Sequence, residues 1–213
     1  MQKKLFTIAL LVAAAGLAGA GAKAGLNLKE PPMELLLDLE GKQVPVALDK
    51  PFTVKVNGAD VTMKITAMPE RTLNLGEATI KYPREYTYAV DDSTEGVLQW
   101  TLSGNDNVVI VSRFTEGAPA ELLKTMEGEL RTAYGRDKTK VVNSEVSIGG
   151  KKYASRKVTA NISGQKLVQE LVGLSAGKAS FILIIQDTPD DNGGTSKDTQ
   201  RMLNLLDKHW KSN

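Results

Sequence analysis

Residues 179–187 read ASFILIIQD, and the stretch FILII at 181–185 is apolar without interruption. Successive side chains of a β-strand point to opposite faces of the sheet. An apolar run of this kind therefore predicts a strand that is covered on both sides, because neither of its faces carries polar residues. Such a strand lies in the middle of a sheet.

Three predicted strands precede this central one, and short turns separate them. The strands are KVVNSEVSI, KKYASRKVTANI and KLVQELVGL, and the turns contain Gly149-Gly150, Ser163-Gly164 and the sequence SAGK from Ser175. Glycine adopts the backbone conformations that tight hairpin turns require. We expect an antiparallel meander of four strands that ends in ASFILIIQD.

Two amphipathic helices are predicted, one before the meander in the sequence and one after it. The first begins at Pro119, which suits the first turn of a helix, and ends before Gly135. Its apolar residues recur at helical spacing: Leu122, Leu123, Met126, Leu130 and Tyr134. The second covers about residues 196–211 and carries one apolar stripe of Met202, Leu203, Leu206 and Trp210. We expect the second helix to pack on the sheet.

The segment 34–75 predicts β-hairpins. Asn57-Gly58, between FTVKV and ADVTMKI, is the strongest of their turn signals. Pairing about this turn places Val54 opposite Val61 and Phe52 opposite Met63 on one apolar face. The other face pairs Lys55 with Asp60 and Thr53 with Thr62. Because isolated hairpins are marginally stable, we expect them to dock on something larger.

The strands ATIKYP, EYTYAV, VLQWTL and VVIVSRF lie between the hairpins and the first helix. The predicted elements follow one another in a fixed order: a strand leading into YPREY (82–86), two strands around WTLSGNDNVVIVSRF, a helix, a four-strand meander ending in QDTPD, and a terminal helix. This order resembles the PsbP-like superfamily. The resemblance covers about residues 76–213. Members include the extrinsic subunit of photosystem II and many uncharacterised exported bacterial proteins.

The resemblance implies an α/β/α sandwich around an antiparallel sheet, and a non-catalytic binding or assembly role outside the cytoplasm. Photosynthetic members use histidine and acidic residues around metals, and no residue here matches that set. We therefore expect an α+β fold, in which helices flank an antiparallel sheet and an N-terminal β-hairpin module precedes it. The expected division is a signal peptide at 1–24, the hairpin module at 25–75 and the α/β/α domain at 76–213.

The first 24 residues, MQKKLFTIALLVAAAGLAGAGAKA, have the features of a secretory signal peptide. Lys3 and Lys4 precede an apolar run, and Ala22-Lys23-Ala24 fits the small-x-small cleavage rule. The alternative is an uncleaved anchor, although the run is shorter than a bilayer requires. We expect an exported protein, periplasmic or extracellular, with no stable membrane span after cleavage.

Charge and cysteine content exclude several classes of protein. The chain has 27 Lys+Arg and 25 Asp+Glu, and the signal peptide takes three lysines, which leaves 24 against 25. This balance predicts neither a nucleic-acid partner nor an anionic membrane surface. With no cysteine and one histidine, His209, the chain has no cysteine-histidine pair and no multi-histidine metal site. We expect that the protein is not an enzyme and uses no cofactor. His209 is expected to have a structural role near a helix end.

The loop DTPDDNGGTSKD at 187–198 is the candidate cation site, with Asp187, Asp190, Asp191 and Asn192 as candidate ligands. An EF-hand loop needs glycine at its sixth position and glutamate at its twelfth. Neither register that the loop allows meets both requirements. The other interpretation is a turn that ends the strand and caps the next helix through Thr195 or Ser196.

Aromatic residues provide a second candidate surface. Tyr82, Tyr86 and Tyr88 have even spacing, and Trp100 lies on the next predicted strand. If they share an exposed face, they form a binding surface for a peptide or a glycan. If they are buried, they belong to the core.

These observations lead to three functional hypotheses. The first is an exported, non-enzymatic binding or accessory protein that acts through protein-protein contacts in the cell envelope. The second is a cation or small-ligand binder that uses the 187–198 loop, with calcium as the cation. The third is a hydrolase of envelope polymers whose catalytic carboxylates the sequence does not pair. Asp91-Asp92 and Asp190-Asp191 are adjacent, and adjacent residues of a strand point to opposite faces.

Overall fold

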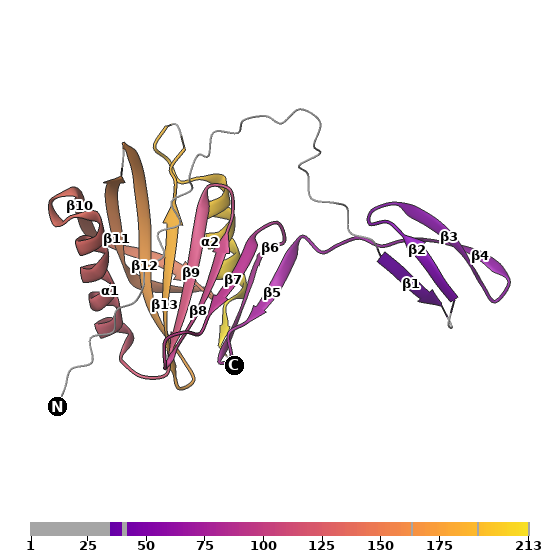
Figure 1. Cartoon of the computed structure of the whole chain (residues 1–213), viewed down its shortest axis with the longest axis horizontal. Coiled ribbons are helices and arrows are strands. Elements are labelled where there is room, and N and C mark those ends of the chain that lie inside the picture. Colours follow the sequence, from indigo (N-terminus) through magenta and orange to yellow (C-terminus); the bar gives the residue numbers. More distant parts are fainter. Residues whose placement is uncertain (1–34, 40–41, 163, 191, 213) are drawn as a thin grey trace. The chain divides into compact units, whose positions relative to one another are not determined.

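The computed structural model describes residues 35–39, 42–162, 164–190 and 192–212 (Figure 1). The expected signal peptide lies outside these residues. The chain divides into two compact units, Met1–Met68 and Pro69–Asn213, and each is considered by itself. Among the described residues, no helix has the length and apolar character needed to cross a bilayer.

The described residues of the first unit form two antiparallel hairpins. One joins β1 (Leu35–Leu39) to β2 (Lys42–Val46), and the other joins β3 (Pro51–Val56) to β4 (Ala59–Lys64).

The register predicted for the second hairpin is confirmed, with Val54 opposite Val61 and Phe52 opposite Met63. Its polar face carries the Lys55–Asp60 ion pair, whose nitrogen and oxygen atoms are 3.0 Å apart. Asn57 and Gly58 have φ angles of 51° and 82°, which a two-residue hairpin turn of this type requires.

The second unit contains a seven-stranded antiparallel sheet in the order β10-β11-β12-β13-β9-β8-β7. Its strands are β7 (Thr87–Asp91), β8 (Val97–Ser103), β9 (Asn107–Phe114), β10 (Thr139–Ile148), β11 (Lys151–Ile162), β12 (Gln165–Ala176) and β13 (Ala179–Asp187). The predicted four-strand meander is β10 to β13. A smaller sheet, β14-β6-β5, contains β5 (Glu70–Asn74), β6 (Ala78–Pro83) and β14 (Lys211–Ser212).

The central position of β13 is confirmed. It lies between β12 and β9, with three strands on either side, and its residues 181–185 are at most 1% exposed. Phe181, Leu183 and Ile185 belong to the main core cluster, while Ile182 and Ile184 point to the other face. Both faces of this strand are therefore covered.

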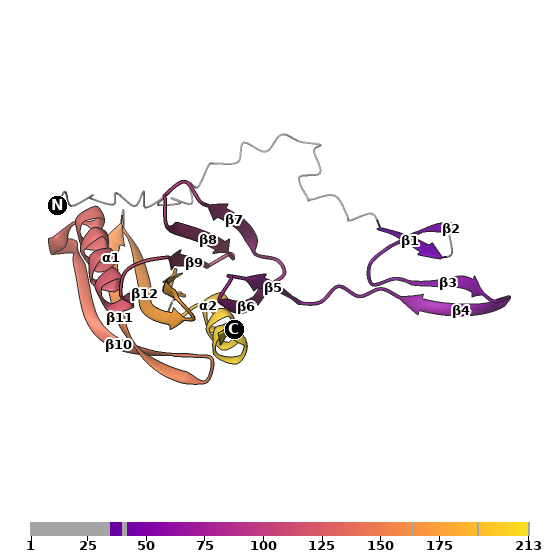
Figure 2. The same cartoon turned by 90° about the horizontal axis from the view of Figure 1, so that it is seen from below.

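A single helix packs on each face of the sheet. Helix α1 (Pro119–Tyr134) contacts β11, β12 and β13, and α2 (Lys197–His209) contacts β6, β10 and β13. Figure 2 shows the two helices on opposite sides of the sheet. Gly173 of β12 allows the close approach of α1, because a Cβ atom there would lie 3.0 Å from the carbonyl oxygen of Pro119. A short 3-10 helix, η1 (Arg136–Lys138), follows α1.

The expected helix-flanked α/β/α sandwich is wrong. Strands make up 56% of the described residues, and within these residues each face of the large sheet carries one helix rather than a layer of helices. Part of the face that α2 occupies is covered instead by the smaller sheet, which contributes Leu73, Ala78, Ile80 and Tyr82 to the core. The fold is therefore mostly antiparallel β, built from one large sheet and several small ones.

The boundary between the two units also differs from the expected one after residue 75. The structure divides after Met68, because β5 pairs with β6 along residues 70–74. The chain before β5 contributes two hairpins, while β5 itself belongs to the core of the second unit through Leu73.

An ion pair joins the smaller sheet to the larger one. Arg113 of β9 donates from Nε to Oε2 of Glu77 at 2.6 Å, and from Nη2 to Oε1 at 2.5 Å. Glu77 lies just before β6, so the pair connects the two sheets at one edge of the core. The hydrogen bonds from Arg113 hold the pKa of Glu77 below its ordinary value of 4.5.

We predict that Glu77→Gln lowers the free energy of unfolding at pH 7 by about 1 kcal/mol, the magnitude of a partly exposed charge-assisted pair. A carboxylate with a lowered native pKa stabilises the fold above its unfolded-state pKa. This stabilisation is lost as pH falls through the native pKa. Urea unfolding at a series of pH values should show a difference between the two proteins at pH 7 that disappears in acid.

Glu116→Gln provides the matched control, because Glu116 is exposed and forms no ion pair within the described residues. Its unfolding midpoint should follow that of the unsubstituted protein at every pH. A difference for Glu77→Gln that persists at the lowest pH would contradict the assigned role of the ion pair.

Candidate functional site

The start of α2 is fixed by hydrogen bonds to side chains. Ser196 is the N-cap residue, and its Oγ accepts the backbone N–H of Thr199 at 3.2 Å. The buried carboxylate of Asp187, at the end of β13, accepts the N–H of Ser196 at 3.3 Å and the hydroxyl of Thr199 at 2.9 Å. The first turn of α2 is therefore attached to the central strand.

Asp198 adds a second connection at this end of α2. Its Oδ2 accepts the backbone N–H of Asn105, in the β8–β9 turn, at 3.0 Å. Its carbonyl oxygen accepts the hydroxyl of Tyr86 at 3.3 Å. Burial raises the pKa of Tyr86 to about 12, so this hydroxyl remains a hydrogen-bond donor at physiological pH.

The β10–β11 turn holds the other end of α2. The N–H of Gly149 donates to the carbonyl oxygen of Leu206 at 3.2 Å, and the N–H of Gly150 donates to Oδ1 of Asp207 at 3.0 Å. Trp210 then packs edge-on against Phe181, with ring centroids 5.6 Å apart. Both ends of α2 are therefore attached to the strands and turns of the second unit.

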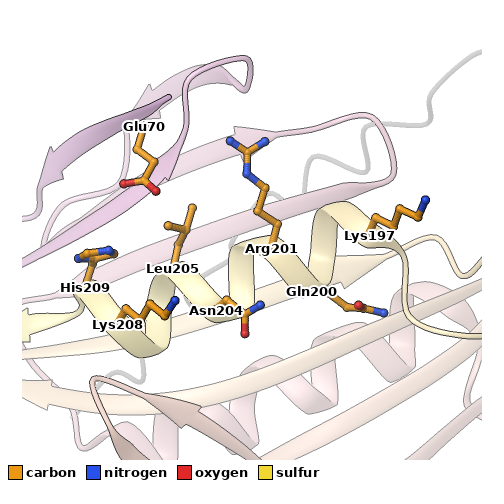
Figure 3. A pocket seen from close by; sticks show the side chains of 8 residues that line it. All are labelled: Glu70, Lys197, Gln200, Arg201, Asn204, Leu205, Lys208 and His209. Atoms are coloured by element: carbon orange, nitrogen blue, oxygen red, sulfur yellow. The ribbon is translucent and has the colours of Figure 1, made fainter. Parts of the chain in front are cut away.

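A groove of about 430 Å³ runs along the outward side of α2 and is bounded by β5. The residues that line it are Glu70, Lys197, Gln200, Arg201, Asn204, Leu205, Lys208 and His209. We call this feature the α2 groove. Figure 3 shows Arg201, Leu205 and His209 on the side of the helix that faces Glu70, with Gln200 and Asn204 further round it.

Cations dominate the α2 groove. Lys197, Arg201 and Lys208 outweigh the single carboxylate of Glu70, which pairs with Lys81 at 3.3 Å. Arg201 is held by Glu85 and by the carbonyl oxygen of Pro69. Lys197 and Lys208 are exposed and form no ion pair within the described part of the chain.

The remaining groove residues add hydrogen-bonding groups and one apolar surface. Gln200 and Asn204 are exposed amides, each of which both donates and accepts hydrogen bonds. Leu205 is 6% exposed and provides an apolar floor. His209, expected to have a structural role at the helix end, lines the groove in the last turn. The arrangement suits an anionic ligand that also carries hydrogen-bonding groups.

The structure places two of the candidate metal ligands, Asp187 and Asp190, in hydrogen bonds of the loop and of α2. Asp187 is used at the start of α2, and Oδ1 of Asp190 accepts the backbone N–H groups of Asn192 and Gly194 at 2.9 and 2.8 Å. Asp191 lies outside the described residues. Within the described ranges, no three acidic, histidine or cysteine side chains gather where they could hold a metal ion.

The four candidate aromatic residues do not form one exposed surface. Tyr82, Tyr86 and Trp100 are 5%, 3% and 5% exposed and belong to the core cluster. Tyr88, on β7, is 46% exposed. Tyr82 lies on β6, Tyr86 in the turn that follows it and Tyr88 on β7, so the even spacing does not place them on one strand face.

Sequence reasoning missed the α2 groove, although one signal was present. Lys197, Arg201, Asn204 and Lys208 follow helical spacing on the side of α2 opposite its apolar stripe. Such a stripe is also the ordinary solvent-facing side of a helix. The position of Glu70 beside it depends on β5, which was not predicted to pair with β6.

Comparisons with known proteins identify no family. No protein-family model matches the chain. No curated protein matches it either.

Solved structures show partial likenesses. A protein from Bacteroides thetaiotaomicron has 16% identity and a TM-score of 0.41 over 64% of this chain, which spans 45% of that protein's length. LpqN of Mycobacterium tuberculosis, which is involved in cell envelope biogenesis, has 17% identity and a TM-score of 0.37, with 67% of this chain and 89% of LpqN covered. PA94 of Pseudomonas aeruginosa, a protein of unknown function, has 17% identity and a TM-score of 0.29, with 57% and 85% covered. Likenesses at this level assign neither a family nor a function to the chain.

We predict that Asp187→Ala lowers the thermal unfolding midpoint and reduces the free energy of unfolding by about 1–3 kcal/mol. The substitution leaves the N–H of Ser196 and the hydroxyl of Thr199 without their buried acceptor. Asp190→Ala should have a smaller effect, because its partners lie in an exposed turn. Differential scanning calorimetry measures both changes.

Millimolar calcium should leave the midpoint of the unsubstituted protein unchanged. A calcium-dependent rise that either substitution abolishes would instead support a cation site in this loop.

Proposed function

We propose that this protein is an exported, non-enzymatic accessory protein of the cell envelope, and that it binds an acidic segment of a partner protein in the α2 groove. The observation that carries the proposal is the cationic side of a helix whose two ends are both fixed to the sheet. Because the helix is already in place, binding does not require the backbone that carries these charges to become ordered.

Charge supports an anionic occupant. The mature chain is close to neutral, with 24 basic and 25 acidic residues after removal of the expected signal peptide. The groove is therefore a local concentration of positive charge on a balanced protein. Lys197 and Lys208 have no ion pair among the described residues, so neither must lose a partner when a carboxylate approaches.

The groove's other residues support a peptide as the anionic occupant. Asn204 can donate to a carbonyl oxygen and accept from an N–H group, which are the groups that a peptide backbone repeats. Gln200, whose Nε2 donates to the carbonyl oxygen of Thr195 at 2.8 Å, offers its side-chain oxygen as a further acceptor. Lys197 and Lys208 are separated by roughly 16 Å along the helix axis at 1.5 Å per residue. An extended peptide of about five residues covers this length.

An NMR titration tests the binding site. The isotope-labelled mature chain is titrated with a synthetic oligoglutamate peptide, and an oligolysine peptide of equal length serves as the ligand control. Chemical-shift changes should be confined to α2 and β5, occur only with oligoglutamate, and weaken as salt increases.

We predict that the triple variant Lys197→Glu, Arg201→Glu, Lys208→Glu abolishes these shifts, because it reverses the groove's charge. The matched control is Lys140→Glu, Lys166→Glu, Lys178→Glu, which makes a similar charge change at three exposed lysines away from the groove. The control should retain binding within about twofold, whereas the groove variant should lose it by more than tenfold. Equal losses in both variants would show unspecific charge attraction and contradict the proposal.

Partner capture addresses the envelope role directly. The mature chain and the two triple variants are crosslinked in envelope extracts, and bound proteins are identified by mass spectrometry. A partner retained by the control variant and lost by the groove variant supports the proposal. A partner retained by both variants would place recognition elsewhere on the protein.

A further inference from the structure

Strand β7 forms one end of the seven-stranded sheet. Within the described residues it pairs with β8 alone, and all five of its residues are exposed. Figure 2 shows it beyond β9 and β8 at the end of the sheet. The outer edge of such a strand presents backbone N–H and C=O groups that can pair with another strand.

The residues of β7 offer little protection against such pairing. Its sequence, TYAVD, contains no proline and no lysine, which commonly protect edge strands. Tyr88 and Val90 are 46% and 53% exposed, and both are among the few large apolar residues exposed in the described chain. The opposite edge strand, β10, differs because it carries Lys140 and Glu145.

Tyr88 and Val90 continue the apolar face of the core. Tyr88 lies opposite Leu102 and Val90 opposite Trp100 in the β7–β8 register. Leu102 and Trp100 are buried in the main core cluster. The face that packs under α2 and the smaller sheet therefore reaches the edge of the sheet with two apolar side chains.

The sequence of β7 is complementary to itself in antiparallel pairing. With Ala89 on a two-fold axis, Tyr88 lies opposite Val90 of a second copy, and Thr87 lies opposite its Asp91. Both tyrosine-valine pairs fall on one face, and the hydroxyl of Thr87 can donate to the carboxylate of Asp91 on the other. No like charges oppose each other in this register, and all five residues are paired.

We propose that two copies of this protein associate through β7, in antiparallel register about Ala89, and so join their seven-stranded sheets into one. This surface lies on β7, whereas the proposed binding function uses the α2 groove. The dimer would present two α2 grooves to one partner or to two.

Charge substitution at the two-fold axis tests both the surface and the identity of the occupant. Ala89 is exposed, so Ala89→Lys and Ala89→Glu each place two like charges opposite each other only when the second strand comes from another copy of the same variant. Sedimentation velocity of the mature chain over a range of micromolar concentrations measures association. Circular dichroism confirms that each variant is folded.

The unsubstituted protein should be a dimer, and each single variant should be at least tenfold weaker in association. An equimolar mixture of Ala89→Lys and Ala89→Glu should restore the dimer, because opposite charges then face each other. Thr87→Asp places a second carboxylate opposite Asp91 of the other copy and should also weaken association. It is the test variant if the Ala89 variants do not fold. Val142→Lys, at an exposed apolar residue of the other edge strand, is the matched control and should remain a dimer.

Three results would overturn the proposal. The first is an unsubstituted protein that stays monomeric at the highest concentration tested, as expected if β7 takes a strand of another protein or of the same chain. The second is a dimer that Ala89→Lys, Ala89→Glu and Thr87→Asp leave intact. The third is a mixture of Ala89→Lys and Ala89→Glu that fails to associate although both variants are folded.

Discussion

The burial of both faces of β13 is the constraint on which the second unit depends. Residues 181–185 place apolar side chains alternately toward α1 and toward α2 with the smaller sheet, and the strand is stable in water only if both layers are present. The same strand ends in Asp187, whose carboxylate accepts hydrogen bonds from Ser196 and Thr199 at the start of α2. The core and the candidate site are thus connected through one strand, and the groove's geometry depends on the packing beneath it.

Local signals predicted much of this fold. The apolar run at 181–185 gave the central strand, Asn57-Gly58 gave the hairpin register, and Pro119 and Gly135 marked the bounds of α1. Each of these depends on residues close together in the sequence. The smaller sheet was not predicted in full, because ERTLN at 70–74 contains only one apolar residue, Leu73, and so lacks a local strand pattern. Its pairing with β6 depends on tertiary contacts. The small sheet that this pairing forms covers part of the face on which a layer of helices was expected.

The candidate site was less predictable than the fold. The carboxylates of the 187–198 loop predicted a cation site, and those that the structure describes serve as hydrogen-bond acceptors for the loop and for α2. The groove uses common residues, Lys197, Arg201 and Lys208, whose importance depends on β5 lying beside them. Kinship with PsbP-like proteins stays a prediction, since it rested on element order and no family model matches the chain.

The pairing of β14 with β6 has a consequence for the order in which the unit can fold. Lys211 lies opposite Thr79, so a strand formed early in synthesis pairs with one formed near the end. Until α2 and β14 are available, Ala78 and Ile80 have no complete cover, and a partly synthesised chain exposes this apolar surface. The apolar face of the smaller sheet is therefore completed only by the last elements of the unit.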